Sequence, residues 1–90
     1  MEVFELRTDW ANEDSNDVDT MLYETHEKAK AAFLEEIEAA KVDYDQAFDE
    51  DGTLCDGWVL DESVDFWELY QDNYYCFNHC RITINEKEVL

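Results

Sequence analysis

Hydrophobic and polar residues alternate along the start of the chain. Apolar side chains, including Phe4 and Leu6, fall on one side of the alternation, and charged side chains fall on the other. This two-residue period predicts a β-strand over Met1–Trp10 with one buried face. A polar segment, Ala11–Asp17, follows, and the alternation returns over Val18–Glu24. Two strands joined by a polar turn favour an antiparallel hairpin.

The period lengthens to three and four residues over the next stretch, His26–Phe48. That stretch contains neither glycine nor proline and is rich in residues that favour helices. Thr25 stands where a helix N-cap is expected, and Glu27 suits the positive end of the helix dipole. The sequence therefore predicts one long helix with an apolar stripe of Ala29, Phe33, Ile37, Ala40, Tyr44 and Phe48.

An acidic loop, Asp49–Gly57, separates this helix from the rest of the pattern and contains both glycines of the chain. Strand-like residues follow over Trp58–Leu60 and Val64–Tyr70, and we expect a break between them at Asp61–Glu62. A turn then leads into a last strand over Tyr74–Asn85.

These elements predict an α+β fold in the order β-β-α-β-β, with one long helix packed on an antiparallel sheet of about four strands. A chain of 90 residues forms a single domain, over residues 1–90. Because the helix covers one sheet face, we expect aromatic and acidic side chains on the opposite, partly exposed face. That face either binds a partner or is covered by a second copy in a homodimer.

Charge limits the kinds of partner. The chain has 25 acidic residues against six lysines and arginines, which gives a formal net charge of −19. Its 46% hydrophobic and 14% aromatic content supplies the apolar surface that disordered acidic chains lack. Because the basic residues are few and scattered, direct binding to nucleic acid or to an anionic membrane is not expected. A basic protein, or the basic groove of a nucleic-acid enzyme, is the complementary partner.

Carboxylates are concentrated between Lys41 and Arg81, where eleven acidic residues occur without a lysine or arginine. The candidate partner-binding carboxylates are Asp43, Asp45, Asp49, Glu50, Asp51, Asp56, Asp61, Glu62 and Asp65. The candidate aromatic anchors in the same stretch are Trp58, Trp67 and Tyr70. Each of these three aromatic residues can instead belong to the core.

The candidate metal ligands are Cys55, Cys76, His79 and Cys80. In a strand, Cys76 and Cys80 would lie about 13 Å apart and His79 would face the other way, so one zinc ion could not bind all three. The segment Asp49–Gly52 does not match an EF-hand loop, because the first and last ligand positions of such a loop would not hold oxygen ligands. The sequence therefore predicts no cofactor and no dedicated metal site.

No nucleophile–histidine arrangement, phosphate-binding glycine loop or dinucleotide fingerprint occurs, which predicts that the protein is not an enzyme. A small enzyme or metal-binding domain that uses the cysteines and His79 is one alternative. Three cysteines, with no secretory signal and no apolar segment long enough to span a bilayer, indicate free thiols and a cytoplasmic location.

In size, charge and α+β layout, the whole chain resembles the small acidic inhibitors encoded by phages and mobile elements, in particular anti-CRISPR proteins and anti-restriction DNA mimics. The segments that carry the resemblance are LEEIEAAKVDYDQAFDEDGTLCDG and VLDESVDFWELYQDNYY. The resemblance implies a protein inhibitor, present in the host cytoplasm if phage-encoded, whose carboxylates block the DNA-binding groove of a CRISPR effector nuclease such as Cas9.

Carboxylates can replace DNA phosphates in this way because they form charge-assisted hydrogen bonds with the same arginines. The alternative is an acidic adaptor or regulatory module that binds a basic protein partner without imitating DNA.

Overall fold

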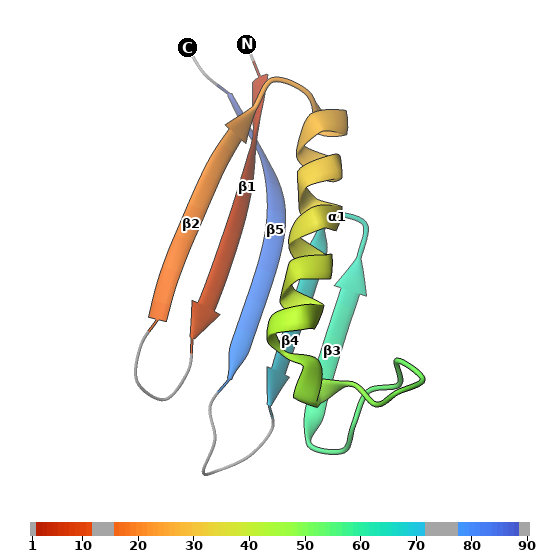
Figure 1. The fold of residues 1–90 in the computed structure, drawn as a ribbon. Helices are drawn as coiled ribbons and strands as arrows, with labels where there is room; N and C mark the ends of the chain where they lie inside the picture. Colours follow the sequence, from red (N-terminus) through yellow and green to blue (C-terminus); the bar gives the residue numbers. More distant parts are fainter. Residues whose placement is uncertain (1, 12–15, 72–77, 89–90) are drawn as a thin grey trace.

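Two β-hairpins lie at the two edges of a single sheet (Figure 1). The structure is a computed structural model that describes residues 2–11, 16–71 and 78–88. In one hairpin β1 (Glu2–Ala11) pairs with β2 (Asn16–Tyr23), and in the other β3 (Trp58–Ser63) pairs with β4 (Phe66–Gln71). β5 (His79–Glu88) joins the hairpins, so the strand order is β2-β1-β5-β4-β3 and each neighbouring pair is antiparallel.

Helix α1 (His26–Asp43) covers one face of this sheet and carries the chain from the β2 edge to the β3 edge (Figure 1). The hydroxyl oxygen of Thr25 accepts a hydrogen bond from the backbone N–H of Lys28 at 3.2 Å, so the expected N-cap is confirmed. The first four residues of the predicted stripe, Ala29, Phe33, Ile37 and Ala40, are buried.

The helix ends at Asp43 and not at Phe48 as predicted. Tyr44 adopts φ −112° and ψ 44°, outside the helical region, and its backbone N–H donates to the carbonyl oxygen of Ala40 at 2.8 Å. A single 3-10 turn, η1 (Asp45–Ala47), follows and buries Ala47 completely. The apolar spacing continues through both segments, which is why the sequence predicts one helix.

The predicted fold class is confirmed: one helix packs on an antiparallel sheet, which has five strands in the described residues and not about four. β3 runs without interruption through Asp61 and Glu62, so the predicted break there is wrong. The chain reverses at Val64–Asp65 instead. Residues 74–77 of the predicted last strand lie outside the described residues, and β5 continues to Glu88.

The core lies between α1 and the sheet. Alternate strand residues contribute the side chains that face the helix, and the largest of those that are fully buried are Trp67, Leu69 and Ile82. Among the described residues, no charged or polar residue is buried. The charged side chains therefore lie on the surface, where their arrangement determines what the protein can bind.

The other sheet face, which we call the open face, carries the strand residues that alternate with the buried ones. No described element lies over it (Figure 1). Register and alternation place these charged side chains on the open face: Glu5, Arg7, Asp9, Asp61, Glu68, Arg81 and Lys87.

Candidate functional site

Every lysine and arginine of the chain lies within ion-pair distance of a carboxylate. The pairs are Arg7–Asp9 (3.0 Å), Lys28–Glu24 (3.7 Å), Lys30–Asp65 (3.5 Å), Lys41–Glu38 (3.9 Å), Arg81–Glu68 (3.0 Å) and Lys87–Glu5 (2.8 Å). Of the 25 acidic residues, these pairs involve six and three more lie outside the described ranges, which leaves sixteen. Those sixteen described carboxylates have no lysine or arginine within ion-pair distance.

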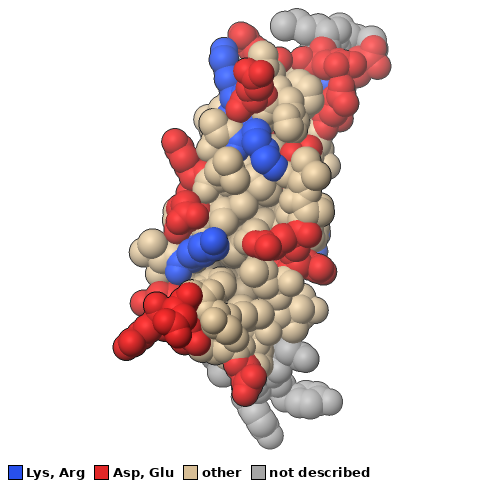
Figure 2. Space-filling model, turned by 90° about the vertical axis from the view of Figure 1, so that its right-hand side faces the viewer, with Lys and Arg blue, Asp and Glu red and all other residues tan. Residues whose placement is uncertain are grey.

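Several of these unpaired carboxylates gather where α1 stops. Asp43 is the last residue of α1, Asp45 begins η1, and the following loop projects from the body of the molecule (Figure 1). We call this region the acidic end and define it as Asp43, Asp45, Asp49, Glu50, Asp51 and Asp56, all of which are exposed. Figure 2 shows acidic side chains grouped at this end of the molecule. All six belong to the predicted partner-binding set.

The loop at the acidic end is held by its own hydrogen bonds. The Asp49 carboxylate accepts from the backbone N–H of Asp51 at 3.0 Å and of Thr53 at 2.9 Å. Gly52 has φ of 81°, a conformation that favours glycine, and its N–H donates to the carbonyl oxygen of Asp49 at 3.0 Å. Asp49 therefore fixes the turn, and the exposed carboxylates of Glu50 and Asp51 remain for a partner.

The structure separates the other predicted carboxylates from the acidic end. Asp61 and Glu62 are consecutive in β3 and point to opposite faces, Asp61 to the open face. Asp65 lies beyond the far end of β3, where its carboxylate is 2.9 Å from His26 Nε2 and 3.5 Å from Lys30 Nζ. Asp65 is thus the one member of the predicted set that has a basic partner.

The predicted aromatic anchors are not exposed. Trp58 is 8% exposed and Trp67 is 1% exposed, so both are core residues, while Tyr70 is half-buried on the open face. The exposed tryptophan is Trp10, at 41%. Sequence reasoning missed it because the alternation groups it with Phe4 and Leu6. The sequence signal for its exposure was its position at the end of the first predicted strand, next to the polar segment.

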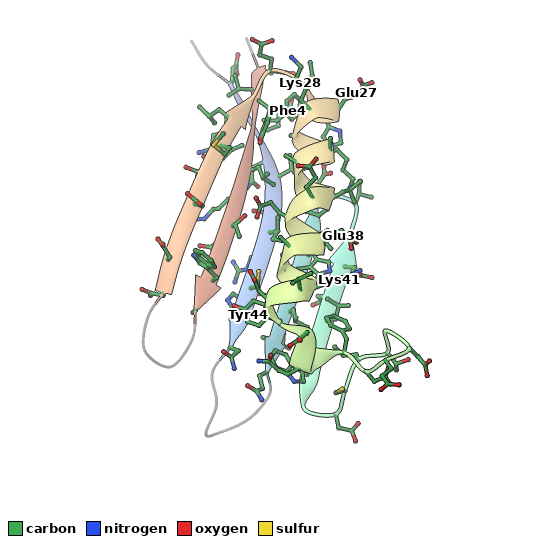
Figure 3. All side chains as sticks on the ribbon, in the orientation of Figure 1. Phe4, Glu27, Lys28, Glu38, Lys41 and Tyr44 are labelled. Carbon is green, nitrogen blue, oxygen red and sulfur yellow. The ribbon has the colours of Figure 1, made fainter. Side chains whose placement is uncertain are left out.

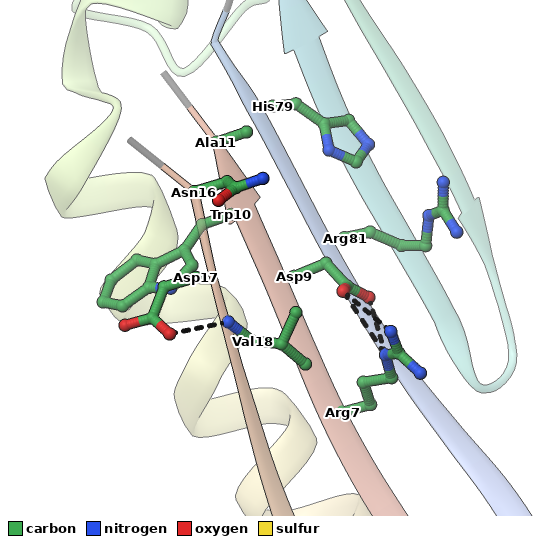
Figure 4. Close-up of a pocket in the computed structure, with 9 residues that line it drawn as sticks. All are labelled: Arg7, Asp9, Trp10, Ala11, Asn16, Asp17, Val18, His79 and Arg81. Atoms are coloured by element: carbon green, nitrogen blue, oxygen red, sulfur yellow. Dashed lines mark hydrogen bonds and ion pairs between the residues drawn. The ribbon is translucent and has the colours of Figure 1, made fainter. Parts of the chain in front are cut away.

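The open face differs from the acidic surface that we expected, because it carries three of the six basic residues together with four carboxylates. Figure 4 shows Arg7, Asp9, His79 and Arg81 on this side of the sheet, with Trp10 on the side of α1. Glu68 accepts hydrogen bonds from His79 at 2.7 Å and from Arg81 at 3.0 Å. These hydrogen bonds lower the pKa of Glu68, and the bond from His79 contributes most. Burial of the carboxylate acts in the opposite direction.

The candidate metal ligands are not gathered. His79 faces Glu68 on the open face, whereas Cys80 is 3% exposed in the core, so the expected separation of these neighbours is confirmed. Cys55 is half-buried in the loop before β3, and Cys76 lies outside the described residues. Within the described ranges, no group of three histidine, cysteine or acidic residues is placed to hold a metal ion. No described helix is both long and apolar enough to cross a bilayer.

Comparison with protein-family models, with curated proteins and with solved structures finds no match for this chain.

Proposed function

We propose that this protein is a non-enzymatic inhibitor that occupies the nucleic-acid groove of a basic protein, with a CRISPR effector nuclease such as Cas9 as the partner to test. The observation that carries the proposal is the acidic end. Its exposed carboxylates have no lysine or arginine partner, and the loop that presents several of them is fixed by hydrogen bonds.

The carboxylate surplus is not explained by stability. Like charges on a compact surface repel one another and destabilise the fold. Such repulsion is relieved when a cationic surface binds, so the same carboxylates that weaken the free protein strengthen a complex with a basic partner. This argument favours binding as the reason for the surplus.

The density of charge supports a nucleic-acid groove as the target. The molecule is 45 Å long, and dividing that length by the net charge of −19 gives about 2.4 Å per charge. Duplex DNA carries one charge per about 1.7 Å of its axis, and each strand carries one per about 3.4 Å. Averaged over all of its faces, the protein therefore carries a net charge per unit length between that of one strand of duplex DNA and that of the whole duplex.

The fixed loop also lowers the cost of binding. Ordering a flexible segment on a partner opposes association, and a segment that is already ordered avoids that cost. Because Asp49 holds the turn, Glu50 and Asp51 can meet arginine or lysine side chains without prior folding of the loop.

A binding assay with guide-loaded Cas9, with and without bound target DNA, tests the proposal. We expect binding that bound DNA blocks and that weakens by about tenfold or more as salt is raised, because screening removes the electrostatic attraction. The double variant Glu50→Lys/Asp51→Lys should abolish inhibition of DNA cleavage.

The matched control is Glu86→Lys/Glu88→Lys, which makes the same change in net charge at two exposed residues of β5, away from the acidic end (Figure 1). Equal effects of both double variants would contradict a specific role for the loop. Binding that DNA does not block would identify an adaptor instead of a mimic.

A further inference from the structure

A groove lies between α1 and the β1–β2 hairpin, beside the acidic end. It has a volume of about 60 Å³, which suits the head group of one side chain and not a folded loop. Trp10, Tyr44 and Cys80 contribute its apolar lining, and Asp19, Glu36 and Asp43 contribute its carboxylates.

Trp10 gives the groove an exposed aromatic wall. The side chain is 41% exposed, and Figure 4 shows it on the side of the sheet where α1 lies. Tyr44 lies at the end of α1 next to the strands (Figure 3), and its hydroxyl is 3.5 Å from the carbonyl oxygen of His79. Its ring also contacts that of Trp58 edge to face, with 6.3 Å between centroids. The aromatic lining is therefore anchored to the core on one side and open on the other.

The three carboxylates of the groove have no lysine or arginine within ion-pair distance among the described residues. Asp43 is the last residue of α1, where the helix dipole disfavours negative charge. Burial, followed by the charges of Glu36, Asp43 and Asp9, raises the pKa of Cys80 to about 12. Burial, Cys80 and Asp43 also raise the pKa of Tyr44. The groove thus has a negative potential that nothing in the described protein neutralises.

We infer that this groove receives an arginine side chain of the basic partner, with the guanidinium stacked on Trp10 and hydrogen-bonded to the carboxylates of Asp19, Glu36 and Asp43. The inference rests on the proposed function because it takes the partner to be basic. A planar guanidinium can stack face to face on an aromatic ring while its N–H donors point outwards in a fixed plane, whereas a lysine ammonium has no planar face to stack.

Two other occupants fit the groove less well. A metal ion is disfavoured because, in the described part of the chain, no three ligating side chains are close enough to hold one. A second copy of this chain would have to supply Arg7 or Arg81, the only arginines, and both are paired with carboxylates on the open face. Two copies would also repel each other through their charge of −19 each.

Titration with hexa-arginine and hexalysine peptides at fixed salt tests this inference without Cas9. For the wild-type protein, we expect hexa-arginine to bind about threefold or more tightly than hexalysine, and the indole N–H resonance of Trp10 to shift on binding. Glu36→Gln/Asp43→Asn should weaken hexa-arginine binding about tenfold, because charge-assisted hydrogen bonds are lost. Trp10→Leu should remove the preference for arginine.

The matched control is Glu86→Gln/Glu88→Gln, which removes the same two charges from exposed residues of β5 that lie outside both the groove and the acidic end. Circular dichroism of each variant checks the fold. Equal weakening by both double variants, or equal binding of the two peptides to the wild-type protein, would overturn the inference. Neither result would contradict the proposed function, which is decided by DNA-blocked binding to Cas9.

Discussion

The three tryptophans occupy different environments, and each environment determines the role of the side chain. Trp67 is 1% exposed in the core, and its Nε1 has no hydrogen-bond partner among the described residues. An unsatisfied N–H in the core costs free energy, which the burial of the large indole ring must offset. Trp58 is 8% exposed, whereas Trp10 is 41% exposed and gains much less from folding.

Replacement of Trp67 should therefore destabilise the fold far more than replacement of Trp10. We expect Trp67→Ala to lower the free energy of unfolding by about 3–5 kcal/mol, and Trp10→Ala to lower it by about 1 kcal/mol or less. Urea denaturation measures both. Trp67→Phe removes the unsatisfied N–H with a smaller change in volume, so it should lose less stability than Trp67→Ala. Similar losses for Trp10→Ala and Trp67→Ala would contradict the assigned environments.

Glu68 makes stability depend on pH. Its folded pKa lies below the ordinary value of 4.5, because the carboxylate accepts hydrogen bonds from His79 and Arg81. A lowered pKa stabilises the fold above the unfolded pKa, and this contribution is lost as pH falls through the folded pKa. Glu68→Gln should thus cost stability at pH 7, and the deficit relative to the wild-type protein should shrink as pH falls below 4.5.

Denaturation curves at pH 7 and at several values below pH 4.5 measure this dependence. Glu35→Gln is the control, because Glu35 is exposed on α1 and has no described ion pair. A deficit of Glu68→Gln that stays constant with pH would show that the carboxylate charge is not the cause.

At the scale of the elements, local sequence patterns predicted a boundary correctly where the residues at that boundary are typical of a helix or strand end. The N-cap at Thr25 and the buried stripe of α1 follow from residue spacing alone. The turn at Val64–Asp65 contains neither glycine nor proline, so it could not be recognised, and the charged pair Asp61–Glu62 was mistaken for it. Charges are tolerated there because β3 is an edge strand with exposed residues.

The candidate site was predictable only where residues are neighbours in sequence. The acidic end is one such segment, and its carboxylates are exposed as expected. The pairing of Asp65 with His26 joins residues 39 positions apart, and no local pattern indicates it. Likewise, periodicity assigns Trp10 to the face covered by α1, but it cannot show that the ring remains exposed there.

The edge strand β2 should be the least protected strand. Its residues are exposed except for the half-buried Tyr23, and among the described strands it pairs only with β1, whereas β5 has partners on both sides. Hydrogen exchange measured by NMR should show faster exchange in β2 than in β5, because local opening of an edge strand exposes little apolar surface. Protection of β2 equal to that of β5 would contradict this expectation and would indicate that a second copy covers the edge.

For the whole molecule, the distribution of charge matters more than its sum. Three basic residues lie with four carboxylates on the open face, so that face has a net charge of about −1 out of −19. Nearly all of the repulsion therefore arises among the carboxylates on the helix side and at the ends of the molecule.

Salt should stabilise this protein. Screening of that repulsion favours the compact state, and for a domain of this size each gain of about 1 kcal/mol raises the melting temperature by about 4–8 °C. Thermal denaturation monitored by circular dichroism from low to high sodium chloride measures the effect. The variant Glu50→Gln/Asp51→Asn should show a weaker dependence on salt. A melting temperature that falls with salt would mean that the described ion pairs outweigh the repulsion.

The nearly neutral open face also gives the molecule an electric dipole moment. When the protein diffuses towards a positively charged surface, the field exerts a torque that turns the acidic end and the helix side forward before contact. A larger share of collisions then begins in the orientation that places these carboxylates on the partner. In a complex formed in this orientation, the open face of the sheet would face the solvent.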